Sequence, residues 1–581
     1  MQLIRFNTTI VLIIIVSCPL WICAQIPKNS RFIPPLKIPL LLSGNFGELR
    51  SNHLHSGLDF KTYGLPGLNI YATDDGYISR IKIEQSGFGN AIYISHPNGY
   101  TSVYGHLSKF RPDIDSLINV WHYKENKFSI EIFLKPNELK VRKGEIIAFS
   151  GNSGGSMGPH LHFEIRDKSQ MPVNIQRYFN FPITDTIPPK IYNVWVYPMD
   201  SMSFVNHENL PHCLKAIHRN GKTILDADQP IYVKGKIAFG IETLDFMNLS
   251  SSTLGVYSIE VYLNNRLEFS QVIDRILFSE NRSVNSLIDY GYYVKNRVRI
   301  NRLYVQPNNN LSIYHGVRNQ GVILLQDPSE YNVRIRVADN NLNISEVKFA
   351  VKYSIKEGNS IPKPSLNNAG TKLINCFVGD NSRNDQVEIH FPALSMFDNF
   401  SIHYERLPGM QGFFSNIHHF KNEDIPINKP VNLKIKARNI PLKLQSKALL
   451  ARINDFGEMD WFGGGYSGGF VSAPIRTFGK YAIVVDTIAP CIVLINKFVK
   501  NQDFSDWDKI AFTVTDSQSG ISFFSGKIDG QWALFEYDEK QDLIYYRFDL
   551  RKIKSKMKHS LDFLVIDKKG NKASYNSIIY K

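Results

Sequence analysis

Short β-favouring segments separated by glycine-rich turns fill the chain from Gly44 to Tyr178, and this rhythm limits the fold more than any other feature. The segments include Gly76 to Ile83, Ala91 to Ser95, Thr101 to Tyr104 and Ile146 to Ser150. Turn signals such as Asp75-Gly76, Gly87-Phe88-Gly89-Asn90 and Pro97-Asn98-Gly99 separate them. This pattern predicts an antiparallel β domain. The stretch from Pro112 to Pro136 breaks the rhythm, and we expect a short helix and an extra strand there.

A second pattern occurs twice further along the chain. Asp185-Thr186-Ile187-Pro188-Pro189 and Asp486-Thr487-Ile488-Ala489-Pro490 share the form DTIxP, and alternating apolar residues follow each. Each segment closes on a D-x-x-x-N-like turn, the first around Asp339 and the second from Asp567 to Asn571. Alternating strands with polar turns suit two packed sheets. The pattern resembles the immunoglobulin-like sandwiches found beside extracellular bacterial enzymes.

The length of 581 residues predicts roughly three to five domains. Aromatic residues make up 12% of the chain, which favours strands over helices. We therefore expect a mainly β protein. Its predicted parts are an antiparallel β domain over 44–180, an immunoglobulin-like region over 185–355, a β module over 369–482 and an immunoglobulin-like sandwich over 486–581. Pro362 to Asn368 is interpreted as a linker.

The first residues have the layout of a secretory signal peptide. Arg5 precedes the apolar run from Ile10 to Val16, and cleavage is expected after Ala24, so 1–24 is the signal and 25–43 an extended lead-in. A membrane anchor is disfavoured because the run is too short to span a bilayer. Lipidation at Cys18 ranks second, since Pro19 is unfavourable after a lipobox. We expect an exported protein of the periplasm or cell envelope, with an outer-membrane lipoprotein as the alternative.

The net charge of +14 is compatible with anionic wall polymers, anionic lipid, or simple solubility. No arginine-rich tract or nucleic-acid motif is present, so nucleic acid is not an expected partner. Beyond the signal region the cysteines are Cys213, Cys376 and Cys491, too far apart in sequence for a disulfide framework or a metal knuckle. One disulfide or buried free thiols are both compatible with them.

Three segments carry histidines in arrangements suited to metal chemistry. They are His55-Ser56-Gly57-Leu58-Asp59, Tyr104-Gly105-His106-Leu107-Ser108 and Gly158-Pro159-His160-Leu161-His162-Phe163-Glu164. Residues two apart on a strand face the same side, so His160 and His162 should project together. Two imidazoles and a carboxylate leave one position of a zinc tetrahedron open. Taken alone, H-x-H is a weak signal, and position does not decide between His53 and His55. The glycines of Gly151 to Gly158 suit either an open groove or a flexible hairpin loop.

Taken together, six motifs from Gly44 to Tyr178 resemble the lysostaphin/LytM-like zinc endopeptidases. In chain order they are HSGLDF, IYATDDGYIS, GFGN, YGHLS, VRKGEIIAFSGNSG and GPHLHFEIR. The resemblance implies that His55, Asp59 and His162 are zinc ligands. It also implies that His160 is the general base and that His106 assists it, by orienting water or by stabilising the charged intermediate. His53 and His96 match no functional position and are interpreted as surface residues.

The implied function is that of a secreted zinc-dependent endopeptidase, in which zinc-activated water and a histidine base hydrolyse peptide cross-links of peptidoglycan. The alternative is a non-catalytic wall-binding scaffold, or a regulator of other wall hydrolases, acting through the β modules. Those modules could also bind cell-envelope partner proteins. The insertion from Pro112 to Pro136 suits a wall or lid over the groove, although a harmless surface insertion is slightly favoured. For Asp516 to Ile521, an ordinary polar turn is favoured over a calcium-binding one.

Overall fold

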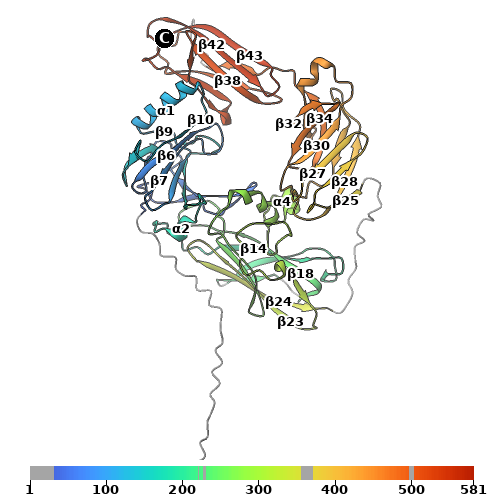
Figure 1. Ribbon diagram of the computed structural model, residues 1–581. Coiled ribbons are helices and arrows are strands. Elements are labelled where there is room, and N and C mark those ends of the chain that lie inside the picture. Colours follow the sequence, from blue (N-terminus) through green and yellow to red (C-terminus); the bar gives the residue numbers. More distant parts are fainter. Residues whose placement is uncertain (1–31, 220, 227–229, 355–370, 496–502) are drawn as a thin grey trace, which may run out of the picture.

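The computed structural model describes residues 32–219, 221–226, 230–354, 371–495 and 503–581. The predicted signal peptide and the predicted linker from Pro362 to Asn368 lie outside these residues. The mainly β prediction is confirmed, since 47% of the residues lie in strands and 9% in helices. Four domains follow one another around a closed ring, numbered here in chain order (Figure 1). In the described part of the chain, no helix is long and apolar enough to cross a membrane.

The first domain is built on an antiparallel sheet with the order β1-β4-β13-β8-β7-β6-β10. These strands are β1 (Leu42–Gly44), β4 (Leu58–Lys61), β13 (His160–Arg166), β8 (Thr101–Gly105), β7 (Asn90–Ser95), β6 (Gly76–Ile83) and β10 (Ile130–Phe133). Smaller elements are β2 (Leu49–Arg50), β3 (His53–Leu54), β5 (Asn69–Tyr71), β9 (Lys109–Phe110), β11 (Lys140–Val141), β12 (Ile146–Phe149) and α2 (Ile175–Tyr178). One face of the sheet packs on the core, where Phe60, Tyr104 and Phe163 are fully buried. The lead-in joins this core, because Phe32 stacks on Phe179 with ring centroids 5.0 Å apart.

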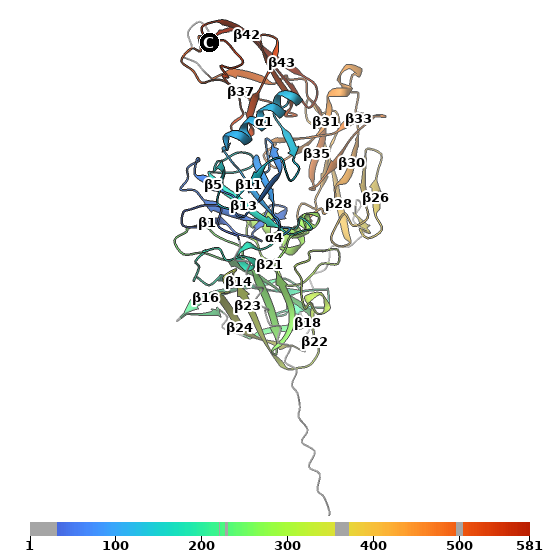
Figure 2. The ribbon, with the colours of Figure 1, turned by 60° about the vertical axis from the view of Figure 1, so that its left-hand side comes forward.

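The predicted helix and extra strand are both present, as α1 (Pro112–Glu125) and β10. Proline is favourable in the first helical turn, and acidic residues there complement the helix dipole. Ile114, Ile118 and His122 recur at four-residue spacing and are buried. The helix ends at Asn126, whose φ of 52° is left-handed. The outer surface of α1 faces the fourth domain (Figure 2).

The second domain has one large curved sheet with the order β15-β18-β14-β16-β17-β24-β23-β19-β20, and β21 and β22 also pair with β18. Its strands are β14 (Lys190–Pro198), β15 (Phe204–Val205), β16 (His212–Arg219), β17 (Lys222–Leu225), β18 (Ile231–Leu244), β19 (Ser258–Leu263), β20 (Arg266–Val272), β21 (Asn301–Arg302), β22 (Ile323–Leu325), β23 (Glu330–Ala338) and β24 (Ile344–Tyr353). Short helices lie between β20 and β21: η1 (Phe278–Ser283), α3 (Val284–Leu287) and α4 (Tyr290–Asn296). The sheet wraps around its own core, in which Val194, Phe239 and Ile335 are buried.

The third domain packs the sheet β25-β28-β29-β35-β31-β32 against the sheet β26-β27-β30-β34-β33. Its strands are β25 (Thr371–Ile374), β26 (Asp380–Arg383), β27 (Val387–Phe391), β28 (Phe400–Leu407), β29 (Ile417–Phe420), β30 (Val431–Lys436), β31 (Ala448–Ile453), β32 (Met459–Gly463), β33 (Gly465–Ser467), β34 (Phe470–Ile475) and β35 (Gly479–Val485).

The fourth domain is a sandwich of two four-stranded sheets, β36-β37-β41-β40 and β39-β38-β42-β43. Its strands are β36 (Cys491–Leu494), β37 (Lys509–Thr515), β38 (Ile521–Ile528), β39 (Gln531–Ala533), β40 (Phe535–Asp538), β41 (Leu543–Arg547), β42 (Lys558–Asp567) and β43 (Lys572–Tyr580). Stacked rings of Phe512, Phe535 and Phe563 fill the space between the sheets. The immunoglobulin-like label stays a prediction. Cys213, Cys376 and Cys491 are free thiols.

Direct contacts join each pair of neighbouring domains. Asn45 and Gly255 exchange two hydrogen bonds between the first and second domains, at 2.7 and 2.8 Å. Asn308 Nδ2 donates to the Met396 carbonyl at 2.7 Å between the second and third. Between the third and fourth, Lys569 Nζ donates to the carbonyls of Ala448 and Gly464 at 2.6 Å.

The ring closes where the fourth domain meets α1. Tyr123 packs edge-on against Trp532 with centroids 5.1 Å apart, and Lys552 Nζ lies 3.6 Å from the Tyr123 ring centre. Lys540 Nζ also donates to the carbonyl of Asn152, in the glycine-rich loop of the first domain. The insertion therefore serves as a contact surface for the fourth domain.

Candidate metal centre

Strand register brings the histidine segments together. On β13, His162 lies opposite Asp59 of β4 on one side and opposite Gly105 of β8 on the other. Leu161 and Phe163 are fully buried in the core, so the alternating histidines project from the other face of the sheet. His55 follows β3 and precedes β4, which places it beside Asp59. Residues more than a hundred positions apart thus meet at the centre of the sheet.

Three ligand-type atoms converge at this point. His55 Nε2 lies 3.1 Å from both His162 Nδ1 and Asp59 Oδ1, and His162 Nδ1 lies 2.9 Å from Asp59 Oδ1. All three side chains are buried. A tetrahedral site with zinc bonds of about 2.0–2.1 Å spaces its ligand atoms about 3.3 Å apart. The spacing therefore fits a single small cation held by His55, Asp59 and His162.

Hydrogen bonds fix which ring nitrogen of each histidine carries a proton. His55 Nδ1 donates to the Asn45 carbonyl at 2.8 Å, because a carbonyl oxygen can only accept. The Glu164 carboxylate accepts from His162 Nε2 at 3.1 Å. The opposite nitrogens, His55 Nε2 and His162 Nδ1, therefore face Asp59. A cation that displaces the proton between His162 Nδ1 and Asp59 would meet three lone-pair donors directed at one point.

Charged neighbours surround this donor set. Glu164 is fully buried, and Arg166 Nε donates to it at 2.7 Å while Ser56 Oγ donates to its other oxygen. Arg50 Nη2 lies 2.5 Å from Asp59 Oδ2. Burial opposes ionisation of Glu164, but Arg166 and His162 outweigh it and lower its pKa to about 2.

The pKa values of the ligands show that the site favours a positive charge. Burial lowers the pKa of His55, so its ring is neutral. Burial also disfavours the charged form of His162, but hydrogen bonds with Asp59 and Glu164 outweigh this and raise its pKa to about 9. For Asp59, burial is outweighed by His55 and by hydrogen bonds from His160 and His162, and the pKa falls well below its usual range. A bound cation would supply the charge that the His162 proton supplies here.

Two further imidazoles lie beside the donor set. His160 Nδ1 donates to the Gly158 carbonyl at 2.8 Å, and its Nε2 lies 3.4 Å from Asp59 Oδ1. His106 Nδ1 donates to the Ser153 carbonyl at 2.8 Å, and its ring centroid lies 4.7 Å from that of His160. Burial first, and then repulsion from His162 and His160, lower the pKa of His106 to about 3. His106 is therefore neutral near pH 7, with a lone pair on Nε2.

The glycine-rich loop is tightly packed at its start rather than flexible. A Cβ added at Gly154, where φ is +66°, would lie 2.3 Å from the backbone nitrogen of Gly89. A Cβ at Gly89, where φ is +62°, would meet the same loop at 2.4 Å. Only glycine permits this approach of two backbones. The contact holds Ser153 in place as the hydrogen-bond acceptor for His106.

The structure corrects one expectation and adds residues that the sequence analysis missed. His96 is not a surface residue: it is 5% exposed, and its ring contacts the Asp75 carbonyl and Ser102 Oγ at 2.8 and 2.7 Å. His53 is partly exposed and contacts the Ser51 carbonyl. Glu164 was missed although it lies two positions after His162, on the same face of β13. Nothing in the local sequence marks Asn45 or Arg50 as partners of the ligands.

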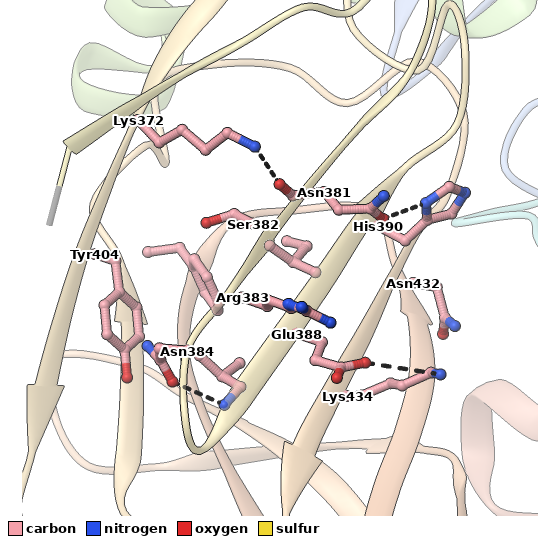
Figure 3. A pocket seen from close by; sticks show the side chains of 13 residues that line it. Lys372, Asn381, Ser382, Arg383, Asn384, Glu388, His390, Tyr404, Asn432 and Lys434 are labelled. Atoms are coloured by element: carbon pink, nitrogen blue, oxygen red, sulfur yellow. Dashed lines mark hydrogen bonds and ion pairs between the residues drawn. The ribbon is translucent and has the colours of Figure 1, made fainter.

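A large hollow lies elsewhere, on the third domain. It has a volume of about 970 Å³, and polar side chains of β25 to β30 line it (Figure 3). Its charges are mostly paired: Lys372 Nζ lies 2.7 Å from Asp380, and Lys434 lies 3.9 Å from Glu388. His390 Nδ1 contacts Asn381 Oδ1 at 2.7 Å. No cluster of metal-ligating side chains lines it among the described residues.

Comparisons with known proteins match the first and third domains to two different families. Residues 53–119 and 128–175 match the model of peptidase family M23, and residues 378–486 match that of a Zu5-like domain. The DD-carboxypeptidase/endopeptidase Mpg of Neisseria meningitidis is 37% identical over 153 residues, which are 25% of this chain and 29% of that protein. The peptidoglycan DD-endopeptidase ShyA of Vibrio cholerae is 31% identical over 156 residues, 26% of this chain and 30% of that protein.

Among solved structures, a zinc containing peptidase from Vibrio cholerae is 26% identical, with a TM-score of 0.19. The match covers 25% of this chain and 39% of that one. The chain spans less than a third of the length of the two curated relatives it matches.

Proposed function

We propose that this protein is a zinc-dependent endopeptidase that hydrolyses peptide cross-links of peptidoglycan, because residues 53–119 and 128–175 match the model of peptidase family M23. The observation that carries the proposal is the convergence of His55 Nε2, Asp59 Oδ1 and His162 Nδ1, with the imidazole rings of His106 and His160 beside them. The similarity to a DD-carboxypeptidase/endopeptidase and to a peptidoglycan DD-endopeptidase supports peptidoglycan as the substrate and a DD cross-link as the bond.

Zinc fits the donor set because two imidazole nitrogens and one carboxylate are the ligands of hydrolytic zinc sites. A zinc ion held by His55, Asp59 and His162 supplies Lewis acidity toward the scissile carbonyl and acidifies water. Glu164 and the Asn45 carbonyl keep both ligand imidazoles in the tautomer that a metal requires. Phe88 stacks on the His162 ring with centroids 4.7 Å apart and shields that side from solvent.

His160 has the properties of a general base. Its Nδ1–H is held by the Gly158 carbonyl, so Nε2 is the nitrogen that would take a proton from the attacking water, once a metal occupies Asp59, and return it to the leaving amine. His106 is neutral with a lone pair on Nε2, so it can accept a hydrogen bond but has no proton to offer an oxyanion. Of the two roles that the family resemblance allows, orienting water is the one that suits this tautomer.

We also propose export to the periplasm or cell envelope, supported by the signal-peptide pattern of residues 1–24 and by a substrate that lies outside the cytoplasm. An outer-membrane lipoprotein anchored at Cys18 is the alternative. Metabolic labelling with a fatty acid separates the two, because only the lipoprotein would incorporate the label.

The test of the enzymatic proposal uses the full chain with purified peptidoglycan. Bound zinc is measured, and the released muropeptides are analysed by mass spectrometry. We expect loss of cross-linked dimers with the unaltered protein, and no loss with His160→Ala or His162→Ala. Zinc should be retained by His160→Ala and lost from His162→Ala, while His53→Ala should match the unaltered protein. Intact dimers with one zinc bound per chain would contradict the enzymatic role and favour a scaffold.

A further inference from the structure

Three carboxylates meet where the first domain is linked to the second. Asp185 lies in the linker, Asp245 directly follows β18, and Asp339 directly follows β23. One oxygen of each lies within 4.8 Å of the other two. These are the first DTIxP motif and its partner turn, which the proposed enzymatic function does not use.

The cluster lacks an internal counter-charge. Asp245 is 2% exposed and Asp339 is fully buried, and Asp245 Oδ1 has no hydrogen-bond partner among the described residues. Within the same described part of the chain, the three carboxylates form no ion pair with a basic side chain. Buried carboxylates are normally paired or coordinate a metal. Burial first, and then the charges of Asp339 and Asp185, raise the pKa of Asp245 to about 8.

Hydrogen bonds hold the carboxylates in place before any ligand binds. Asp339 Oδ1 accepts from the backbone nitrogens of Asn341 and Asn343 at 2.9 and 2.8 Å. Asn343 Nδ2 donates to Asp339 Oδ2 at 2.7 Å and to the Asp185 carbonyl at 3.1 Å. None of these bonds uses Asp245, whose buried side chain places one oxygen within 4.8 Å of the other two carboxylates.

The same turn also contacts the first domain. Asn174 Nδ2 donates to Asn340 Oδ1 at 2.7 Å, and Arg177 Nη1 donates to the Asn340 carbonyl at 3.4 Å. Asn341 Nδ2 donates to the Ile183 carbonyl at 3.2 Å. A ligand held by the three carboxylates would therefore connect the linker, the second domain and, through this turn, the first domain.

The second DTIxP motif builds a matched cluster from Asp486, Asp516 and Asp567 at the start of the fourth domain. Asn571 Nδ2 donates to the Asp486 carbonyl and to Asp567 Oδ2, as Asn343 does in the first cluster. Here, however, Lys569 is close: burial lowers its pKa, and Asp486 and Asp567 oppose that shift. Asp516 Oδ1 accepts from the backbone nitrogens of Gln518 and Gly520, and Asp516 Oδ2 is buried without a hydrogen-bond partner among the described residues. The second cluster thus differs from the first by the nearby Lys569 ammonium group, which disfavours a cation there; the ordinary polar turn expected for Asp516 to Ile521 stays a prediction.

We propose that Asp185, Asp245 and Asp339 bind one calcium ion at the junction of the first and second domains. Carboxylate oxygens without nitrogen or sulfur donors select hard cations, and flexible oxygen cages favour calcium over magnesium. The ion neutralises the three crowded carboxylates and fixes the linker against the second domain. The histidine site has two nitrogen donors and is expected to keep zinc under the same conditions.

The experiment uses the full chain, stripped of metals, reloaded with one zinc per chain and titrated with calcium chloride by isothermal calorimetry. We expect one calcium bound per chain, and an affinity at least about tenfold weaker in Asp245→Asn, which keeps the shape and removes the charge. Asp516→Asn is the matched control from the second cluster and should bind calcium as the unaltered protein does. Hydrogen exchange should show protection of residues 181–190 on calcium addition, and Asp245→Asn should lose that protection.

Three outcomes would overturn the proposal. They are no calcium binding by the unaltered protein, equal affinity for magnesium, or binding that Asp516→Asn removes and Asp245→Asn does not. Asp185→Asn is the second variant, since Asp185 is only partly buried and its replacement cannot disturb a core; circular dichroism confirms that each variant folds.

Discussion

Glu164→Gln tests whether a buried carboxylate that touches no metal directly sets the affinity of the metal centre. In the structure, Glu164 accepts from His162 Nε2 at 3.1 Å, and this bond keeps Nδ1, which faces Asp59, as the nitrogen available to a metal. Glutamine keeps the size of the side chain but removes the charge, and its NH₂ group can turn toward Nε2. His162 would then place its proton on Nδ1, where the metal must bind.

The magnitude follows from the role of such partners. Loss of a hydrogen-bonded partner of a ligand histidine typically weakens metal binding by about 10–100-fold, or about 1.4–2.7 kcal/mol. Arg166 also loses its carboxylate, at Nε and Nη2 distances of 2.7 and 2.6 Å. Because removing one partner of a buried pair typically costs about 3–5 kcal/mol, the variant should also be less stable.

Zinc affinity is measured by competition with a chromophoric chelator, at a temperature where circular dichroism shows the variant to be folded. Glu260→Gln is the control: Glu260 pairs with Arg336 on the second domain at 3.4 Å, far from the metal centre in the fold, and its loss should leave zinc affinity unchanged. A folded Glu164→Gln protein with zinc affinity within twofold of the unaltered protein would show that Glu164 does not set metal affinity by holding the proton of His162 on Nε2.

Further predictions concern His106, the bound zinc, the contact between Tyr123 and Trp532, and the pair of His559 and Asp529. His106→Ala should retain zinc but lose about 10²–10⁴-fold in the rate of muropeptide release; loss of zinc from this variant would make His106 a ligand instead. Treatment with 1,10-phenanthroline should abolish hydrolysis and added zinc should restore it, whereas activity that survives complete removal of zinc would exclude a metal mechanism. Tyr123→Ala should weaken the contact with Trp532 by about 0.5–1.5 kcal/mol beyond the loss of buried area, seen as faster hydrogen exchange over 531–533; unchanged exchange would mean that the contact does not hold the fourth domain. Burial lowers the pKa of His559, but the hydrogen bonds that its ring donates to Asp529 and to the Lys554 carbonyl outweigh burial and raise the pKa. Its stabilising effect is therefore full below its unfolded pKa of about 6.5 and lost as pH rises through the higher folded value, so His559→Gln should flatten the pH dependence of hydrogen exchange in the fourth domain above about pH 6.5.

Much of the fold and of the centre can be predicted because the signals are local. Glycine turns and strand period predict the first sheet, and the two-residue period puts His160 and His162 on one face. The pairing of β13 with β4 and β8 cannot be predicted from local sequence, because His162 lies 103 residues from its partner Asp59 on β4 and 57 residues from its partner Gly105 on β8. The same limit explains the wrong interpretation of His96, whose burial depends on the Asp75 carbonyl and Ser102 packed around it. The choice of His55 over His53 likewise depends on the distant Asn45 carbonyl.

The contact between α1 and the fourth domain has a mechanical consequence. Four domains joined end to end would flex independently at the three junctions between them. The contact between α1 and the fourth domain adds a fourth junction, which converts the chain into a closed linkage. In such a linkage, a rotation at one joint must be compensated at the others or must break the closure. Strain applied to the third domain would then reach the loop of Asn152 from both directions around the circuit. The Tyr123–Trp532 closure is thus a coupling between the distal β domains and the edge of the metal centre.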